Sequence, residues 1–387
     1  MRNRFVSGLL CVVFCLTLCL GALAEPAVPE VAPMVIEMGE SRVAYPQLKS
    51  LPDEAVMALI NGDLVVSGKI SSHIVTLGTL VNSVFTLNVS YREYHDGYVF
   101  SVALDADGKQ PDGRNGHSWA GLSYDLSTGK RLTLDQLFQN PDEAVLFMER
   151  LAEESLGAEM SEYMEYAQLT PLPRDNFYLD QSGITFFYPA DQFKLVSGRS
   201  GACHFFYQEL ADYLLTDETG LPALMGILPQ AYSDKDAAAF IRQMVEDGVL
   251  PGVNAALGQP MTELVDAGRL LRQPDSFPGG RYFLLEAPEY RGVYLISDDM
   301  QSGYDYSVLQ GIQLRRGGLG WLSIGQSRQE DWLRILGQPD ETIIFTDNMS
   351  YDYQLPQGQS DIYHFGGHEL RLHADENGTL CAIQLNQ

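Results

Sequence analysis

Cysteine is scarce in this sequence, which limits how the chain can be cross-linked and which metals it can bind. Of the 5 cysteines in 387 residues, only Cys203 and Cys381 lie outside the N-terminal apolar run. In an oxidising compartment these two permit one disulfide bridge. They fall in what we predict to be different domains, so two buried free thiols are an equally open alternative. Two cysteines alone cannot form a zinc-ribbon site.

Basic residues are half as numerous as acidic ones. The chain has 25 Lys and Arg against 51 Asp and Glu, which gives a formal net charge of −26 at pH 7. Nucleic-acid-binding proteins need a basic footprint that displaces counterions from phosphates, and anionic lipid headgroups likewise attract basic segments. We therefore expect neither nucleic acid nor an anionic membrane surface as a partner.

Sequence motifs that mark enzymes are missing as well. There is no glycine-rich phosphate-binding loop and no dinucleotide-binding fingerprint. His368 and His373 resemble a zinc-protease motif, but they are five residues apart instead of one helical turn, and residues 369–373 alternate like a strand. His364 could join them across a Gly-Gly turn. Polar residues on an exposed hairpin are the simpler interpretation.

Two further segments fail to fit a catalytic or metal-binding pattern. Asp105, Asp107 and Asp112 suggest a calcium loop, but their spacing does not match an EF-hand, and we interpret them as a solvated hairpin tip. Residues 197–201 contain two serines without the flanking glycines of a nucleophile elbow. We therefore predict no catalytic residue, no metal ligand and no cofactor. A carboxylate pair of the glycosidase kind stays open, because acids are plentiful.

The N-terminus is predicted to be a secretory signal peptide that covers residues 1–24. Arg2 and Arg4 are its only charges, residues 5–23 are mostly apolar, and Ala22-Leu23-Ala24 offers small residues at both positions that a signal peptidase reads. Cleavage removes two basic residues, so the mature chain has 25 − 2 = 23 basic and 51 acidic residues, a net charge of −28.

Two other interpretations of this segment remain. An uncleaved membrane anchor is one, since the apolar run nearly reaches a spanning length. A lipoprotein anchored through Cys19 is the other, but the bulky Leu18 before it does not suit that signal. With cleavage, we expect a secreted protein of the cell envelope that has no membrane contact of its own.

We predict an α+β fold in two modules of helices packed on antiparallel sheets. Residues 25–40 are rich in Pro, Ala, Val and Glu and are predicted to be a linker. Residues 41–218 form the first module, in which period-two strand patterns alternate with capped amphipathic helices. Residues 219–252 form a connecting segment and helix.

The C-terminal module is predicted to be a tandem repeat, with repeat one at residues 253–318 and repeat two at residues 319–387. Each copy runs from a Gly-Gln pair through a helical stretch to a Gln-Pro-Asp triplet. Each then enters an aromatic-rich predicted strand, at residues 282–285 or 350–353, and closes on an Ile-Gln-Leu strand. Three landmarks in the same order predict a duplication.

Aromatic side chains are abundant, with 20 Tyr, 17 Phe and 3 Trp. Tyr combines a large contact area with a polar group at low entropic cost, which suits binding surfaces. Half-buried sheet faces also favour aromatics, so packing explains the pattern equally well. If the pattern marks binding, we expect a concave sheet lined by Tyr282, Tyr294, Tyr304, Tyr351 and Tyr353.

Residues 45–215 resemble a known family of secreted bacterial domains. The resemblance is carried by Tyr45-Pro46-Gln47-Leu48, the segment 124–138 with Thr128-Gly129-Lys130 at its turn, and residues 177–188 and 206–210. These segments stand in the order found in the extracellular domain of the lysozyme-sensing anti-sigma factors of Gram-positive bacteria. That family is largely of unknown function and also occurs beside peptidoglycan deacetylase domains. The resemblance implies an α+β binding domain and, in one branch, recognition of lysozyme.

One loop departs from that family, and the C-terminal module has a resemblance of its own. Arg114-Asn115-Gly116-His117 stands where the family has Gly-Gly-Ala-His, so we keep His117 as a candidate binding residue. Residues 253–387 are similar in layout to domains with the fold of the β-lactamase inhibitor protein. That resemblance implies a helical hairpin and a small sheet in each repeat, with a concave aromatic face that binds protein.

Together these observations predict a secreted, non-enzymatic binding protein of the cell envelope of a Gram-positive bacterium. It would recognise a protein or a cell-wall component, and a basic protein such as lysozyme would suit its acidic surface. Two other functions stay open. One is a hydrolase or deacetylase that acts on envelope glycans through an unrecognised site, and the other is a structural envelope protein.

Overall fold

The computed structural model confirms the α+β class, because it combines helices with largely antiparallel sheets. The predicted signal peptide and Tyr304 lie outside the described residues. Within the part of the chain that is described, no helix is both long and apolar enough to cross a membrane. The described residues are 28–79, 85–109, 115–155, 164–196, 198–228, 233–253, 255–266, 270–277, 280–285, 293–297, 308–353 and 355–387.

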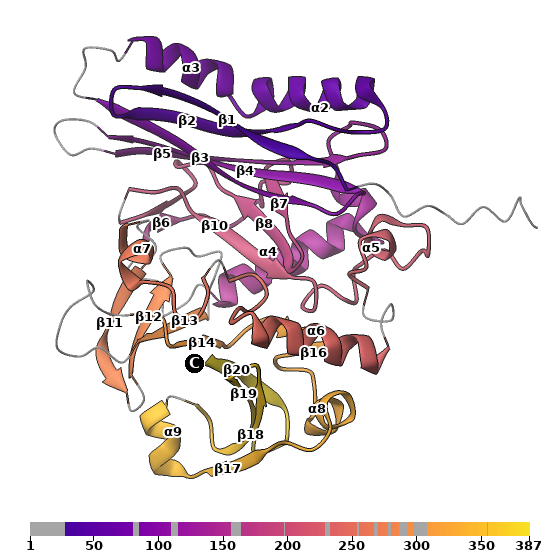
Figure 1. Ribbon diagram of the computed structural model, residues 1–387, viewed down its shortest axis with the longest axis vertical. Coiled ribbons are helices and arrows are strands. Elements are labelled where there is room, and N and C mark those ends of the chain that lie inside the picture. Colours follow the sequence, from indigo (N-terminus) through magenta and orange to yellow (C-terminus); the bar gives the residue numbers. More distant parts are fainter. Residues whose placement is uncertain are drawn as a thin grey trace, which may run out of the picture.

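The first module (residues 28–228) is built on a five-stranded sheet in the order β1-β2-β3-β4-β5. Neighbouring strands are antiparallel except β2 and β3, which run parallel. Helices α2 and α3 cover one face, where Ile60, Leu64 and Ile70 are fully buried, and form the uppermost layer in Figure 1. The bounds are β1 Val31–Met38, β2 Ser41–Leu48, α2 Glu54–Ser67, α3 Ile70–Thr79, β3 Thr86–His95, β4 Val99–Lys109 and β5 Asn115–Asp125.

Strand β1 shows that the prediction of a linker over residues 25–40 was wrong at residues 31–38. Residues 31–38 pair antiparallel with β2 at the edge of the sheet. An edge strand tolerates Pro33, because one row of its backbone N–H groups needs no partner strand. Val35 and Met38 are exposed, so the segment has the composition of a linker although it is a strand.

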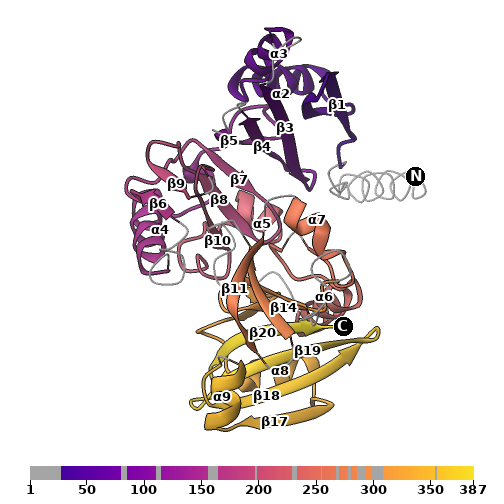
Figure 2. The same cartoon turned by 90° about the vertical axis from the view of Figure 1, so that its left-hand side faces the viewer.

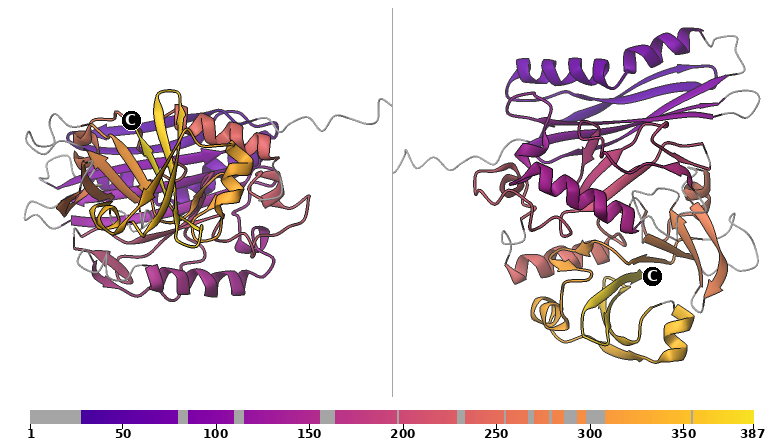
Figure 3. Two further views of the ribbon diagram at one scale, coloured as in Figure 1. Left: turned by 90° about the horizontal axis from the view of Figure 1, so that it is seen from below. Right: turned by 180° about the vertical axis from the view of Figure 1, so that it is seen from behind.

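A three-stranded sheet in the order β10-β8-β7 packs on the opposite face of the five-stranded sheet, near β4 and β5. Ala103, Tyr178 and Phe187 are buried between the two sheets. Helix α4 buries Met148 and Ala152 in the main core of this layer, and Figure 3 shows this helix in the view from behind. The remaining bounds of the module are η1 Leu134–Gln136, α4 Pro141–Ser155, β6 Met164–Ala167, β7 Phe177–Leu179, β8 Gly183–Phe187, β9 Phe193–Leu195, β10 Ala202–Phe206 and α5 Leu221–Leu224.

The C-terminal module (residues 233–387) has one antiparallel eight-stranded sheet, in the order β11-β12-β13-β14-β20-β19-β18-β17. Helices α6 and α8 pack on it, and Ile241, Val245 and Trp332 are fully buried there. Figure 2 shows β17 at the end farthest from the first module. The bounds are α6 Asp234–Glu246, α7 Met261–Asp266, β11 Leu270–Phe277, β12 Gly280–Leu285, β13 Val293–Ser297, β14 Gly311–Leu314, β15 Gly318–Leu319, β16 Leu322–Ser323, α8 Gln329–Leu336, β17 Glu341–Phe345, α9 Asp347–Tyr353, β18 Gly358–Phe365, β19 His368–Asp375 and β20 Leu380–Asn386.

The two predicted repeats share this single sheet. Strands β11 to β14 come from the first predicted repeat and β17 to β20 from the second, and the two sets meet where β14 pairs with β20. Residues 282–285 lie in β12 as predicted, but residues 350–353 lie in helix α9. That prediction was wrong because so short an alternation of apolar and polar residues does not separate a strand from a helical turn. The duplication itself stays a prediction.

Several contacts join the two modules. Tyr294 and Ile296 of β13 pack into the core of the first module. Arg316 pairs with Glu209, with 2.7 Å between Nη2 and Oε1. The predicted connecting segment is divided between the modules, because Leu228 belongs to the core of the first and α6 to the core of the second. Cys203 and Cys381 are both free thiols, which excludes a bridge between them.

Candidate binding site between the modules

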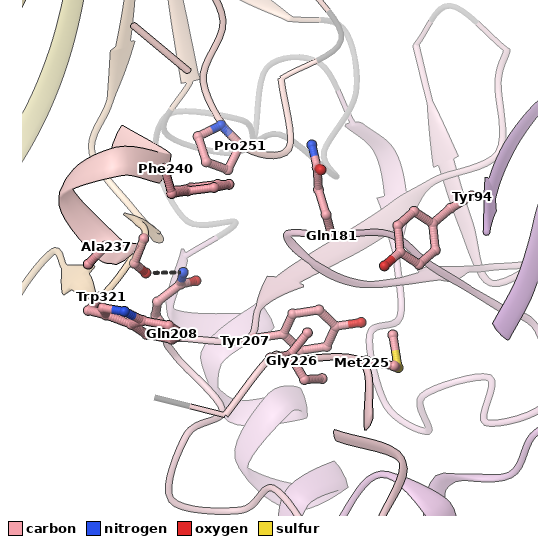
Figure 4. Close-up of a pocket in the computed structure, with 12 residues that line it drawn as sticks. Tyr94, Gln181, Tyr207, Gln208, Met225, Gly226, Ala237, Phe240, Pro251 and Trp321 are labelled. Carbon is pink, nitrogen blue, oxygen red and sulfur yellow. Dashed lines mark hydrogen bonds between the residues drawn. The ribbon is translucent and has the colours of Figure 1, made fainter. Parts of the chain in front are cut away.

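A pocket of about 220 Å³ lies where the two modules meet. The first module contributes side chains from the end of β3, from the β7–β8 turn and from the segment after β10. The C-terminal module contributes α6, the loop that follows it and the β15–β16 turn, as Figure 4 shows. The residues that line the pocket are Tyr94, Gln181, Tyr207, Gln208, Met225, Gly226, Ile227, Ala237, Phe240, Pro251, Gly320 and Trp321.

The walls of this pocket are mainly aromatic and apolar. Tyr94 and Tyr207 line it from the first module, and Phe240 and Trp321 from the C-terminal module. In Figure 4 the hydroxyl groups of Tyr94 and Tyr207 point toward one another. A concave apolar surface with a few polar groups is the usual form of a small-molecule or side-chain binding site.

The Tyr207 hydroxyl and the Gln208 Oε1 atom are buried in the pocket without a hydrogen-bond partner among the described residues. The Gln208 amide is oriented by its Nε2 atom, which donates to the Gly320 carbonyl oxygen over 2.9 Å. A buried polar group left unsatisfied costs about 1–3 kcal/mol. A ligand that supplies partners to these two atoms would recover that free energy.

Negative charge surrounds the Tyr207 hydroxyl. Burial, and then the carboxylates of Asp180 and Asp96, raise the pKa of Tyr207 well above its ordinary value. The phenol is therefore protonated at neutral pH. Asp96 also accepts a hydrogen bond from the Tyr94 hydroxyl, at 3.1 Å, and this contact fixes the second aromatic hydroxyl at the pocket.

The β7–β8 turn places Gln181 at the edge of the pocket. The Asp180 Oδ1 atom accepts hydrogen bonds from the backbone N–H groups of Ser182 (2.7 Å) and Gly183 (3.1 Å), which holds the turn in shape. The loop after α6 approaches this turn at Gly252, whose φ is +73° and whose Cβ, if present, would lie 2.8 Å from Ser182 Oγ. Only glycine allows the two modules to approach so closely at this point.

A second pocket, of about 510 Å³, adjoins the first and shares Tyr94 and Gln181 with it. It carries charged side chains, namely Arg92, Glu93 and Asp180. Glu93 Oε2 is buried without a partner among the described residues, and burial raises the pKa of Glu93. The wider pocket is therefore net negative beside the uncharged, aromatic one.

His117, the candidate from the first module, lies in a buried network away from these pockets. Its side chain is fully buried, and its Nε2 atom lies 2.8 Å from Asp105 Oδ1. Its Nδ1 atom accepts a hydrogen bond from the backbone N–H of Ser200 at 2.9 Å, so Nε2 carries the proton that is donated to Asp105. Arg199 binds the other oxygen of Asp105 at 2.8 Å.

This network contains an Asp, a His and a Ser but does not form a catalytic triad. The Ser200 hydroxyl donates to the His117 carbonyl oxygen at 2.9 Å, and not to the imidazole. Burial alone would raise the pKa of Asp105, but the hydrogen bonds from His117 and Arg199 outweigh it, and the pKa lies below its ordinary value. The arrangement stabilises the contact between β4, β5 and residues 199–200.

The five candidate tyrosines do not come together as one face in the described structure. Tyr294 is 5% exposed and packs into the core, and Tyr353 of α9 packs edge-on against Phe345. Tyr282 lies in β12 and Tyr351 in α9, but their side chains are outside the described part, as is all of Tyr304. The described tyrosines of this set therefore serve packing.

Two of the three histidines of the C-terminal hairpin, His368 and His373, make structural hydrogen bonds, and His364 is exposed. His368 and His373, the pair predicted to resemble a zinc-protease motif, both lie on strand β19, and His364 lies on β18. His373 is 1% exposed, and its two ring nitrogens contact Ser360 Oγ (2.7 Å) and the Pro356 carbonyl (2.8 Å). Among the described residues no group of three His, Cys, Asp or Glu side chains could hold a metal ion.

Sequence reasoning did not identify the pocket residues Tyr207, Gln208, Phe240 and Trp321. Tyr207 and Gln208 directly follow the buried strand β10, where an aromatic residue reads as the end of a core strand. Phe240 belongs to the amphipathic pattern of α6, which predicts a contact with the core. Their assembly depends on the docking of the two modules, for which the sequence carries no local signal.

Comparisons with known proteins find likenesses in structure only. No family model and no curated protein matches the sequence. A DUF3298 family member from Bacteroides fragilis is 13% identical, with a TM-score of 0.38 over 52% of this chain and 97% of that chain. A DUF3298 family protein from Pseudomonas aeruginosa is 14% identical, with a TM-score of 0.37 over 50% of this chain and 97% of that chain. A DUF4309 family protein from Bacillus subtilis is 11% identical, with a TM-score of 0.26 over 40% of this chain and 97% of that chain. These structural neighbours belong to domain families of unknown function.

Proposed function

We propose that this chain is a non-enzymatic binding protein that works outside the cytoplasm, at a bacterial cell envelope, and holds its ligand in the pocket between its two modules. The observation that carries this proposal is the Tyr207 hydroxyl, which is buried in an aromatic pocket without a hydrogen-bond partner among the described residues. A site that uses both modules also explains why the modules are joined by close contacts such as the pair Arg316–Glu209.

Binding is favoured over hydrolysis by the way the reactive side chains are used. The imidazoles of His117 and His373 are buried, and both ring nitrogens of each make hydrogen bonds within the fold. The Ser200 hydroxyl donates to a backbone carbonyl. A general base must reach the proton that it abstracts, and neither imidazole is placed to reach a substrate.

The proposed partner is a basic protein, of which lysozyme is the example to test first. The mature chain would carry −28, of which −17 falls on residues 25–225 (12 basic and 29 acidic) and −11 on residues 226–387 (11 basic and 22 acidic). Such an excess attracts a basic partner over a distance set by the ionic strength. The first module would supply most of this attraction.

The test is binding of the purified protein to immobilised hen egg-white lysozyme and, separately, to peptidoglycan, at several salt concentrations. We expect saturable binding to lysozyme that weakens as salt rises, mainly through a slower association rate. An acidic protein of similar size serves as the control surface and should not bind. Absence of binding to both lysozyme and peptidoglycan at low salt would refute the proposal.

A further inference from the structure

The pocket of about 220 Å³ between the modules, called the junction pocket below, has an uncharged lining but charged neighbours. The described residues that line the pocket are all uncharged. Two carboxylates lie next to this lining: Asp96 accepts a hydrogen bond from the Tyr94 hydroxyl at 3.1 Å, and Asp180 lines the adjoining pocket. The interior of the pocket is therefore at negative potential, although a ligand would touch only neutral atoms.

One cation, Arg92, lies near these carboxylates, in the adjoining pocket. Its guanidinium lies over the rings of Trp119 (5.5 Å) and Tyr178 (5.7 Å). Glu93 and Asp180 line that same adjoining pocket, so their two negative charges exceed its single positive charge.

Tyr207 and Gln208 both offer oxygen lone pairs to a ligand. Gln208 Oε1 can only accept hydrogen bonds, and the Tyr207 oxygen can accept one as well as donate one. The pocket thus favours a ligand group with several N–H donors and a positive charge. The aromatic rings of Tyr94 and Trp321 at the same pocket favour a cation further, because ring faces attract positive charge.

The size of the pocket limits the ligand to one small group. Its 220 Å³ is far more than the ~10–15 Å³ that one water needs. It is less than the ~300 Å³ at which pockets for drug-sized molecules begin. A single extended side chain, or a molecule of similar size, fits this range.

We propose that the pocket between the modules binds a primary ammonium group at the end of an unbranched apolar chain, as at the tip of a lysine side chain. The ammonium donates a hydrogen bond to the Tyr207 oxygen, and its methylene groups pack on the aromatic lining of the pocket toward Phe240. This inference rests on the proposed function, since a basic protein partner presents such groups on its surface.

The first experiment compares two probes of equal length, n-pentylamine and 1-pentanol. Protein labelled at its methionine methyl groups reports on the pocket through Met225, and the core residue Met148 of α4 is the internal control. Replacement of Met225 by Leu assigns the signal. We expect the amine to shift the Met225 signal saturably, with an affinity at least about tenfold above that of the alcohol. Equal affinities, or no shift with the amine, would overturn the inference.

Variants then locate the contact. Tyr207→Phe removes one hydroxyl from the pocket, and Tyr213→Phe is its matched control, because Tyr213 stacks on Phe147 away from the pocket. We expect Tyr207→Phe to weaken amine binding about tenfold and Tyr213→Phe to leave it unchanged. Gln208→Met, at an amide on the other side of the Tyr207 ring in Figure 4, should weaken amine binding less, and thermal unfolding checks that each variant is folded. An unchanged affinity in Tyr207→Phe would refute the site.

The same variants separate this inference from the proposed function. A short peptide with one lysine distinguishes a side chain from a free amine as the source of the ammonium group. If lysozyme binds wild-type protein and Tyr207→Phe equally well, the proposed function stands and the pocket is not its contact site. If n-pentylamine binds in the pocket but no basic protein binds at low salt, the inference stands and the proposed partner is wrong.

Discussion

Gln313 and Gln384 face each other at the centre of the C-terminal sheet, where Gln313 Nε2 donates to Gln384 Oε1 over 2.9 Å. Each is the middle residue of an Ile-Gln-Leu strand, and each Ile lies opposite the Leu of the other strand. The two strands are 71 residues apart in the sequence. This is the pairing that two copies of one unit would make around a local twofold axis, and it supports the predicted duplication.

The glutamine pair should contribute to stability as a unit. Gln313 is fully buried, so Gln384→Leu leaves its amide without this acceptor and should cost about 1–3 kcal/mol. The double variant with Gln313→Leu should cost less than the sum of the two single losses, by about 1 kcal/mol. Urea unfolding measures all three. Gln243→Leu, on the exposed side of α6, should be near neutral, and strictly additive losses would contradict the coupling.

Local patterns predicted several elements of the fold. The Asp53 side chain caps α2 by accepting hydrogen bonds from Ala55 N (2.8 Å) and Val56 N (3.2 Å), as the sequence around it indicates. The hairpin turn at Asp96 forms through bonds from the N–H groups of Tyr98 and Val99, both at 2.9 Å. These signals lie within a few residues of one another, which is why a single sequence reveals them.

Features that depend on distant contacts were not predicted. Strand β1 is half exposed and contains Pro33, so only its pairing with β2 marks it as a strand. The binding hypothesis placed on Tyr294 failed because docking of the modules buries this side chain in the core. Tyr207 of the junction pocket was missed for the same reason, since its role follows from residues of α6 and the β15–β16 turn that lie far along the chain.

Replacement of Asp361 should lower the stability of the C-terminal module strongly. It is 1% exposed, and it accepts hydrogen bonds from Gln329 (2.9 Å), Trp332 (3.0 Å), Thr342 (2.8 Å) and Gln359 (2.8 Å). Asp361→Asn turns one acceptor into a donor that faces these donors, so unfolding free energy should fall by about 2–4 kcal/mol. Urea unfolding at pH 7 measures the loss, and the exposed control Glu376→Gln should leave stability unchanged.

The unfolding free energy lost in Asp361→Asn should become smaller as the pH falls. Burial alone would raise the pKa of Asp361, but its hydrogen bonds outweigh this, and the folded pKa lies below the ordinary value for an aspartate. Asp361 therefore stabilises the protein fully above about pH 5 and loses this contribution as the pH falls through 3.8 toward its folded pKa. The gap between wild type and Asp361→Asn should narrow between pH 5 and pH 3. A constant gap would contradict this assignment.

His117 should matter for stability and not for the ligand. His117→Asn cannot reach both Asp105 and the Ser200 N–H, so it leaves a buried carboxylate short of a donor and should cost about 2–3 kcal/mol. The affinity for n-pentylamine should not change. His364→Asn, at a side chain that is 56% exposed, is the control for a neutral change. Loss of amine binding without loss of stability would instead give His117 a direct role in recognition.

The two thiols should be inert in the folded protein. Cys203 is fully buried, and burial raises the pKa of Cys381 to about 12, so little thiolate exists at pH 8. Iodoacetamide should label neither thiol at pH 8 without denaturant, and both in urea without prior reduction. Mass spectrometry counts the labels. A requirement for reductant in urea would show a disulfide and contradict the free thiols.

Gly317 should be required for the contact between the modules. Its φ is +75°, and a Cβ there would overlap the ring of Phe206 in the first module. Gly367 is a matched control, because its φ is +93° but nothing lies within 4 Å of a Cβ placed there. Both Gly→Ala changes strain the backbone, but Gly317→Ala should cost about 1–3 kcal/mol more, through the added overlap. The difference in unfolding free energy between the two variants, measured with urea, reports the overlap between residue 317 and Phe206. Only Gly317→Ala should also weaken n-pentylamine binding. Equal losses for the two variants would show that the modules do not rely on this approach.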